Sequence, residues 1–241
     1  MCGRFVLAAS REAVESLFEV EISELYEQRF NIAPTQPVLF VHQFQGQLQA
    51  DFARWGLIPH WHKDPKTATL LINARSETVI EKPSFKTAIR HRRVLVPATN
   101  FYEWKRDGRH KRPFAAKRKQ PDGADGLFAF AGIVDEWSDG DGGVLSSLAI
   151  LTQEALGPIA HIHHRLPVVV PKSAFREWLD CPAVSPQEAL ELTQQIDQGG
   201  WDVWPVDQQV NKATAEGAAL LREASQRAAA PEETKRQLDL F

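Results

Sequence analysis

The spacing of apolar and polar residues near the start of the chain predicts a strand followed by a helix. Residues 3–7 form a short apolar run that is typical of a strand. In residues 10–18, Val14, Leu17 and Phe18 fall on one helical face, and Ser10 precedes them as a good N-cap. We therefore expect a capped helix to follow the first strand directly.

A hairpin is predicted next. Pro34 and Pro37 exclude a helix, and the apolar run after them has strand character. A glycine-containing turn at residues 45–47 separates this run from residues 48–59, its expected partner strand. The polar stretch that follows is long enough for a functional loop, and it leads through a buried run at 70–73 to a helix expected to begin at Ser76.

The rest of the chain predicts mainly strands with two helices. Residues 92–106 indicate a strand, a break at Pro97 and a second strand. Further strands are expected at 127–137, 147–152, near 168–170 and at 201–205, and helices at 173–180 and 186–196. Distant strands with few helices between them indicate a mixed α+β fold and not a regular βαβ alternation.

Composition indicates the number of domains and the cellular compartment to expect. The 241 residues are 43% hydrophobic and 24% charged, and no apolar run approaches the roughly 18–20 residues of a membrane span. We expect one soluble cytoplasmic domain over residues 2–213, followed by a helical or disordered tail over 214–241. Two cysteines, Cys2 and Cys181, are too few for a disulfide framework.

The net charge of −3 hides an uneven distribution. Residues 86–119 contain twelve Lys or Arg and two acidic residues, which gives this stretch +10 and the remainder −13. A protein with this balance is not a generally basic nucleic-acid binder, but a locally positive face is expected.

Cys2 is the first candidate for chemistry. Removal of Met1 would leave Cys2 with a free α-amine and a thiol on adjacent carbons. Their ordinary pKa values are about 7.7–8.0 and about 8.5, so a useful fraction of each is nucleophilic near neutral pH. Such an aminothiol condenses with an aldehyde to an imine and then to a five-membered thiazolidine. The alternative is that Cys2 has no role at a frayed terminus.

Glu103 and His163 are candidates for proton transfer. Glu103 lies between two aromatic residues in a strand, where burial would raise its pKa toward that of a general acid. His163 precedes a strand and titrates near neutral pH. The alternatives are an ordinary salt bridge for Glu103 and a structural role for His163.

Other polar residues suit a phosphate-bearing sugar. Asn73 both donates and accepts hydrogen bonds, which suits an aldehyde or hydroxyl oxygen. Three arginines, Arg4, Arg75 and Arg165, stand within two residues of these candidates and could bind phosphates. Trp61 could stack on a base, although tryptophan is more often a core residue. Five of the eight histidines could suggest a zinc site: His60, His62, His161, His163 and His164. No CxxC or HExxH motif is present, so no metal and no cofactor is expected.

The order of several short motifs resembles one family. MCGRF, NIAPTQ, RWGLIPHW, INARSET, FYEWK, AGIVDEW, IHHRLPVVV and WPVDQQVN follow one another between residues 1 and 211. This series is similar to the SRAP (SOS-response-associated peptidase) family. The family usually has Gly in place of Asn100 and Met in place of Leu166, two differences beside the site that affect its fine geometry.

The resemblance implies a fold and a function. It implies a mixed, partly barrel-like β-sheet core with flanking helices, and a sensor of abasic sites in single-stranded DNA. Cys2 would cross-link covalently to the ring-opened sugar, with Asn73, Glu103 and His163 in the active site. Arg75 and Arg165 would contact phosphates, and Trp61 would contact DNA. Lyase activity and a peptidase activity that removes Met1 are also implied.

Two other functions stay open, and a partner is suggested. An N-terminal-nucleophile glutamine amidotransferase also begins with an exposed cysteine, and a non-catalytic single-strand binder would need only the basic stretch. The final residues QLDLF resemble a motif for the bacterial β sliding clamp, through Gln237, Leu238, Leu240 and Phe241. A monomer, associated with the nucleoid when bound to DNA, is expected.

Overall fold

Five strands close into a small barrel in the computed structural model, which describes residues 2–195 and 200–224. β10 pairs with both β4 and β9, and the order β10-β4-β3-β6-β9 returns to β10. The barrel strands are β3 (Pro37–Phe44), β4 (Gln47–Trp55), β6 (Arg93–Ala98), β9 (Phe128–Ser138) and β10 (Val144–Glu154). Three short strands extend this sheet: β5 (Asn73–Arg75), β11 (Arg165–Pro167) and β12 (Val169–Val170). The α+β class with a partly barrel-like core is confirmed.

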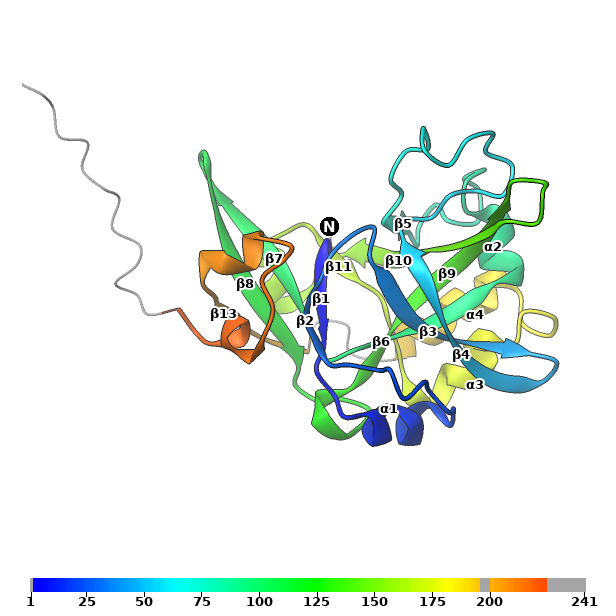
Figure 1. Cartoon of the computed structure of the whole chain (residues 1–241). Coiled ribbons are helices and arrows are strands. Elements are labelled where there is room, and N and C mark those ends of the chain that lie inside the picture. The colour runs from blue at the N-terminus through cyan, green and yellow to red at the C-terminus, as the bar shows by residue number, and fades with distance from the viewer. Residues whose placement is uncertain (1, 196–199, 225–241) are drawn as a thin grey trace, which may run out of the picture.

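A second sheet has the strand order β13-β8-β7-β1-β2. Its strands are β1 (Arg4–Leu7), β2 (Arg29–Ile32), β7 (Asn100–Asp107), β8 (His110–Arg118) and β13 (Trp201–Pro205). β1 runs between the projecting β7–β8 hairpin and the barrel strands (Figure 1). The two sheets therefore meet along β1, beside the start of the described chain.

Helices are short and lie outside the sheets. The α-helices are α1 (Arg11–Phe18), α2 (Lys86–His91), α3 (Phe175–Leu179) and α4 (Pro186–Leu192). The 3-10 turns are η1 (Ala124–Gly126), η2 (Gly157–His161), η3 (Lys172–Ala174), η4 (Thr193–Gln195), η5 (Gln208–Asn211) and η6 (Ala218–Leu221). Across residues 2–195 and 200–224, no helix is long and apolar enough to cross a membrane.

The helix α1 and the β3–β4 hairpin form where the local sequence predicted them. The Ser10 hydroxyl accepts a hydrogen bond from the backbone N–H of Ala13, and Val14, Leu17 and Phe18 are buried. β3 and β4 pair from Pro37↔Arg54 to Phe44↔Gln47. Ser185 and Glu188 form a reciprocal capping box at α4, which lies in the expected segment.

Two local predictions were wrong. No helix begins at Ser76, because its backbone N–H donates to the carbonyl of Thr152 and the segment continues as turns beside β10. Pro97 does not break its strand: it pairs with Ala129 inside β6. β6 meets β3 only at Val41↔Leu95, so Pro97 occupies an edge-like position where a missing N–H is tolerated.

Phe5 anchors β1 to the barrel. Its buried ring meets Trp55 edge-on at 5.2 Å and Phe130 at 5.9 Å between ring centroids. Edge-to-face aromatic pairs add to the large apolar area that such rings bury. Since Cys2 lies three residues before Phe5, this packing also fixes where the start of the chain lies.

Residues 214–224, which the sequence assigns to the tail, lie against the second sheet. Glu216 pairs with Arg29 of β2, and Leu220 is buried. The domain boundary after residue 213 stays a prediction. The rest of the predicted tail lies outside the described residues.

Candidate functional site

Cys2 lies in a buried position just before β1. Its carbonyl accepts a hydrogen bond of 2.8 Å from Nδ2 of Asn73, and its Sγ lies 3.8 Å from the carbonyl oxygen of Arg4. Burial, and then the nearby Glu103 carboxylate, raise the pKa of the thiol well above its usual range. The thiol is therefore protonated at neutral pH in this environment. Cys181, the other free cysteine, is only partly buried.

Glu103 is buried on β7, the strand next to β1. The pairing Arg4↔Tyr102 brings the chain before Arg4 alongside Glu103 and Trp104. The backbone N–H of Trp104 donates to Oε2 of Glu103 at 3.3 Å. Desolvation of the carboxylate raises the pKa of Glu103, as expected from its sequence environment, which makes it a better proton donor at neutral pH.

His163 faces Glu103 from the loop before β11. Its Nδ1 lies 3.8 Å from Oε1 of Glu103 and accepts a 3.0 Å hydrogen bond from the backbone N–H of Arg165. Burial, with a smaller contribution from the stacked His164 ring, lowers the pKa of His163 to about 4. His163 is thus neutral at pH 7, so its contact with Glu103 is not an ion pair. An imidazole whose Nδ1 accepts carries its proton on Nε2.

Asn73 holds the start of the chain against the barrel. It lies on β5, which pairs with β10 through Ile150↔Asn73. Its Nδ2 binds the Cys2 carbonyl, whereas its buried Oδ1 has no hydrogen-bond partner in residues 2–195 and 200–224. A buried acceptor without a partner costs free energy unless a ligand or water donates to it.

The site therefore forms where the two sheets meet. Glu103 comes from the second sheet and Cys2 from the residues just before β1, whereas Asn73 comes from β5 and His163 from the loop before β11. The structure brings together all four residues that the sequence proposed for catalysis. Their catalytic roles stay predictions.

A cavity of about 650 Å³ opens beside these residues. Glu103 and His163 line it together with cationic, aromatic and polar side chains: Arg4, Ile72, Arg75, Trp104, Arg106, Lys111, His164 and Asn211. Within the part of the chain that the structure describes, none of its four Arg and Lys side chains pairs with a carboxylate. Four cations without acidic partners favour a ligand with several negative charges.

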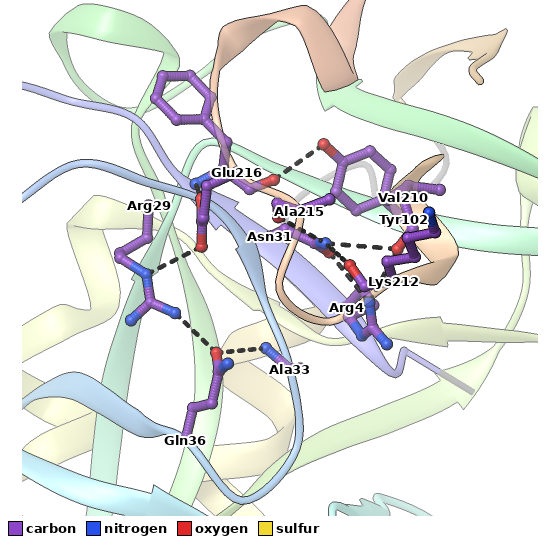
Figure 2. A network of polar contacts seen from close by, with 11 residues as sticks. Arg4, Arg29, Asn31, Ala33, Gln36, Tyr102, Val210, Lys212, Ala215 and Glu216 are labelled. Carbon is purple, nitrogen blue, oxygen red and sulfur yellow. Dashed lines mark hydrogen bonds and ion pairs between the residues drawn. The ribbon is translucent and has the colours of Figure 1, made fainter. Parts of the chain in front are cut away.

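A polar network orients Arg4 (Figure 2). Its Nη1 donates to Oδ1 of Asn31 at 3.2 Å and to the carbonyl of Val210 at 2.9 Å. The Asn31 amide donates in turn to the carbonyls of Lys212 and Ala215. The Arg4 guanidinium lies partly out of water, and this burial lowers its pKa. A nearby anion would stabilise its charged form.

Arg75 and Trp61 are exposed, whereas Arg165 is not. Arg75 lines the cavity. Trp61 is 55% exposed on the loop after β4 and does not line this cavity. Arg165 is buried, and both of its Nη atoms contact the Glu77 carboxylate at 2.7 and 2.8 Å. The expected phosphate contacts of Arg75 and Arg165 and the DNA contact of Trp61 stay predictions.

The basic stretch 86–119 runs through α2, the core and the β7–β8 hairpin. Arg93 and Arg118 are buried. The exposed tip of the hairpin carries Lys105, Arg106, Arg109, Lys111 and Arg112 against a single acid, Asp107. The register places Lys105 opposite Arg112 and Arg106 opposite Lys111. Like charges directly opposite each other destabilise a strand pair, so this hairpin gains from a polyanion.

Sequence reasoning missed three kinds of site residue. Trp104 and Asn211 lie inside the quoted motifs, and their link, from Nε1 of Trp104 to Oδ1 of Asn211 at 2.7 Å, joins positions 107 residues apart. Arg106 and Lys111 belong to the basic stretch, but the sequence did not predict that they lie opposite each other on β7 and β8. The sequence suggests His164 only as a metal ligand, and no group of three His, Cys, Asp or Glu side chains gathers as a metal site within the described ranges.

These features define a class: an α+β protein with a cysteine near its N-terminus beside a carboxyl–imidazole pair and a cationic cavity. The family model "SOS response associated peptidase (SRAP)" matches residues 1–213, and the chain belongs to this family.

Named relatives agree with that assignment. The chain is 35% identical over 225 residues to the abasic site processing protein YoaM of Bacillus subtilis, covering 92% of this chain and 97% of YoaM. It is 31% identical over 232 residues to YedK of Escherichia coli, also named an abasic site processing protein, covering 92% and 99%.

One solved structure shows the same fold. A protein from Bacteroides thetaiotaomicron superposes with a TM-score of 0.81 at 23% identity, covering 93% of this chain and all of that one.

Proposed function

We propose that this protein processes abasic sites in single-stranded DNA by forming a covalent cross-link through Cys2. The observation that carries the proposal is the 2.8 Å hydrogen bond from Asn73 to the Cys2 carbonyl, which holds the start of the chain beside Glu103. The names of the family relatives support abasic-site processing as the general role. The unpaired cations of the cavity would bind the phosphates on either side of the damaged sugar.

The chemistry begins with opening of the abasic sugar. Most of the sugar is a closed hemiacetal, and opening it moves a proton from the C1′ hydroxyl and delivers one to the ring oxygen. Glu103, with its raised pKa, is suited to protonate the ring oxygen, and its carboxylate can then take the proton of the C1′ hydroxyl. Neutral His163, whose Nδ1 already accepts from Arg165, can donate a hydrogen bond from Nε2 to the sugar. The product is an aldehyde at C1′.

The α-amine of Cys2 then attacks C1′, once Met1 has been removed. Loss of water gives an imine, and the thiol adds to the same carbon while its proton moves to nitrogen, which closes a thiazolidine. Because burial keeps the thiol protonated, the amine is the better first nucleophile. The phosphate contacts would come from Arg4 and Arg75, and Trp61 would contact a base.

The ring also determines which side reactions follow. In the thiazolidine, C1′ no longer activates the neighbouring C2′ proton, so elimination of the phosphate is suppressed. If the imine persisted, the same residues would support strand cleavage, which is the proposed lyase activity. The peptidase activity is proposed to remove Met1.

The decisive experiment uses single-stranded DNA with one abasic site. We expect a heat-resistant adduct on a denaturing gel with the wild-type protein and none with Cys2→Ala, while intact mass shows loss of Met1. Absence of an adduct with the Met-processed protein would refute the proposal. Glutamine hydrolysis without an adduct would instead indicate an amidotransferase. Unchanged behaviour of Cys2→Ala would indicate a non-catalytic single-strand binder.

The sequence of the C-terminus supports a separate proposal, that residues 237–241 bind the β sliding clamp. Gln237, Leu238, Leu240 and Phe241 match a short docking motif but lie outside the described residues. Deletion of 237–241 should abolish binding to purified clamp and leave the adduct on free DNA unchanged. Equal clamp binding with and without these residues would refute it.

A further inference from the structure

Trp61 is exposed, although both of its neighbours in the chain are held by the barrel. Its side chain is 55% exposed, and its ring lies tilted against the His62 ring at 6.1 Å between ring centroids. The backbone N–H of His60 donates to Oδ2 of Asp135 at 2.9 Å, and the Trp137 indole donates to the carbonyl of His62. Since Asp135 and Trp137 lie two residues apart on β9, both bonds come from one face of that strand.

Asp135 also binds the imidazole of His60. Its carboxylate is 2% exposed, and Oδ2 lies 3.0 Å from Nδ1 of His60. A carboxylate has only acceptors, so Nδ1 carries a proton in this contact. Oδ1 accepts from Nη1 of Arg92 and from the backbone N–H of Glu136. Asp135 is thus hydrogen-bonded through both oxygens and holds the His60 ring, although that side chain is 46% exposed.

The same segment is held at two earlier positions. The backbone N–H of Ile58 donates to the hydroxyl of Ser147 on β10 at 2.8 Å, and that of Leu57 donates to the carbonyl of Leu71 at 3.0 Å. An exposed aromatic ring on a freely moving loop would lose conformational entropy when it binds a nucleobase. A ring that is already held in place avoids much of that cost, so its stacking contributes more to affinity.

We propose that His60 and Asp135 are positioning residues that hold Trp61 ready to stack on a base of single-stranded DNA. This inference rests on the proposed function, in which Trp61 contacts a base. Neither residue lines the cavity beside Cys2, so the effect falls on DNA affinity and not on the proton transfers of the reaction.

The test measures affinity for an undamaged single-stranded oligonucleotide. His60→Ala removes the ring contact but keeps the Asp135–Arg92 pair, and it should weaken affinity about 2- to 12-fold, the size of ordering one side chain. Trp61→Ala should weaken it about 5- to 150-fold, the range for one stacked base. When Trp61 is already alanine, His60→Ala should cause no further loss. The salt slope should stay at the wild-type value in all three proteins.

Asp135→Asn weakens the same contact from the other side and should show the same dependence on Trp61. If this buried substitution prevents folding, His60→Ala still decides the question. His42→Ala is the matched control, because it removes a 3.1 Å contact between a histidine and Asp51 on the β3–β4 hairpin. It should leave affinity unchanged.

Two results would overturn the inference. The first is an equal loss of affinity in His60→Ala with and without Trp61, which would mean that His60 acts elsewhere. The second is a salt slope reduced by about 0.7 in His60→Ala, the value for one phosphate of a single strand, which would make His60 a direct phosphate contact.

A label on the tryptophans gives a readout that needs no DNA. The chain has seven tryptophans, and the fluorine resonance of 5-fluorotryptophan at Trp61 is assigned by its loss in Trp61→Phe. We expect one narrow line in wild type and a broader or shifted line in His60→Ala. An unchanged line would overturn the positioning role even if affinity fell. Binding of wild type to DNA without an adduct would refute only the proposed function. Unchanged affinity of His60→Ala, in a protein that forms the adduct, would overturn only this inference.

Discussion

The Asn73 side-chain amide donates to the Cys2 carbonyl across the boundary between the two sheets, at 2.8 Å. Asn73 belongs to a short strand beside the barrel, and Cys2 precedes the first strand of the other sheet. This bond is therefore a direct link between the element that carries the proposed nucleophile and the element that faces it.

Loss of this link should slow the reaction more than it weakens DNA binding. Asn73→Asp keeps the shape but removes the donor and sets a carboxylate against the Cys2 carbonyl. We expect the adduct rate at saturating DNA to fall by about 10- to 100-fold. Gln49→Glu, which adds the same charge at an exposed position of β4, controls for charge. An unchanged rate in Asn73→Asp would show that the bond does not position Cys2.

His163 makes stability depend on acidity. Its pKa of about 4 in the folded protein lies below its ordinary value near 6.5, so the unfolded chain binds the proton first. The contribution of neutral His163 is complete above about pH 6.5 and is lost as pH falls toward 4. His163→Gln should therefore lose less stability than wild type over this window in urea unfolding. Parallel curves for the two proteins would contradict the shift.

Glu103 makes stability depend on pH in the opposite direction. Its pKa is raised in the folded protein, so its contribution is present below about pH 4.5 and is lost as pH rises through the raised value. Glu103→Gln should gain stability relative to wild type as pH rises from 5 to 8, and it should form adduct more slowly. Thermal unfolding at several pH values checks the first expectation. A constant difference between the two proteins across this range would be evidence against a raised pKa.

The hairpin cations should determine how salt affects binding. Neutralising Arg106 and Lys111 together removes the two cavity-lining charges of the hairpin and should reduce the salt slope of single-strand affinity by about 1.4, about 0.7 for each phosphate. The same double variant relieves a like-charge cross-strand pair, so its free energy of unfolding should not fall. Lys82→Gln, an exposed cation outside the hairpin, should leave the slope unchanged.

Phe5 should be essential for the integrity of the site. Phe5→Ala removes a buried ring between Trp55 and Phe130 and should cost about 3–5 kcal/mol of folding free energy. Phe44→Ala, at a ring that is 54% exposed, provides the matched comparison and should cost far less. Chemical denaturation distinguishes the two, and equal losses would contradict the anchoring role of Phe5.

Local sequence patterns predicted the elements whose structure depends on residues close together in the chain. Ser10 and the apolar face behind it specify α1, and the turn at Gly46 specifies the β3–β4 hairpin, because both depend on contacts within a few residues. β8 was not predicted, since its basic residues and Pro113 hide the alternation. Its place in the sheet follows from pairing with β7 and β13, which no local pattern shows.

The site was predicted as a set of residues but not as an arrangement. Motif order identified Cys2, Asn73, Glu103 and His163, which the fold brings together. The sequence could not show that Glu77 pairs with Arg165, because 88 residues separate them and neither position is unusual alone. Nor could it show that Asn31 orients Arg4, since that depends on carbonyl groups of residues 210–215.

The meeting of two sheets at the site makes reactivity a property of the finished fold. A nascent or partly unfolded chain carries the same cysteine, but Asn73 and His163 reach it only after the barrel has closed and β1 has docked. An aminothiol without these neighbours has only its intrinsic reactivity toward the aldehydes of the cell. Completion of folding thus restricts the proposed chemistry to molecules that also possess the cationic cavity, and so to aldehydes that arrive attached to phosphates.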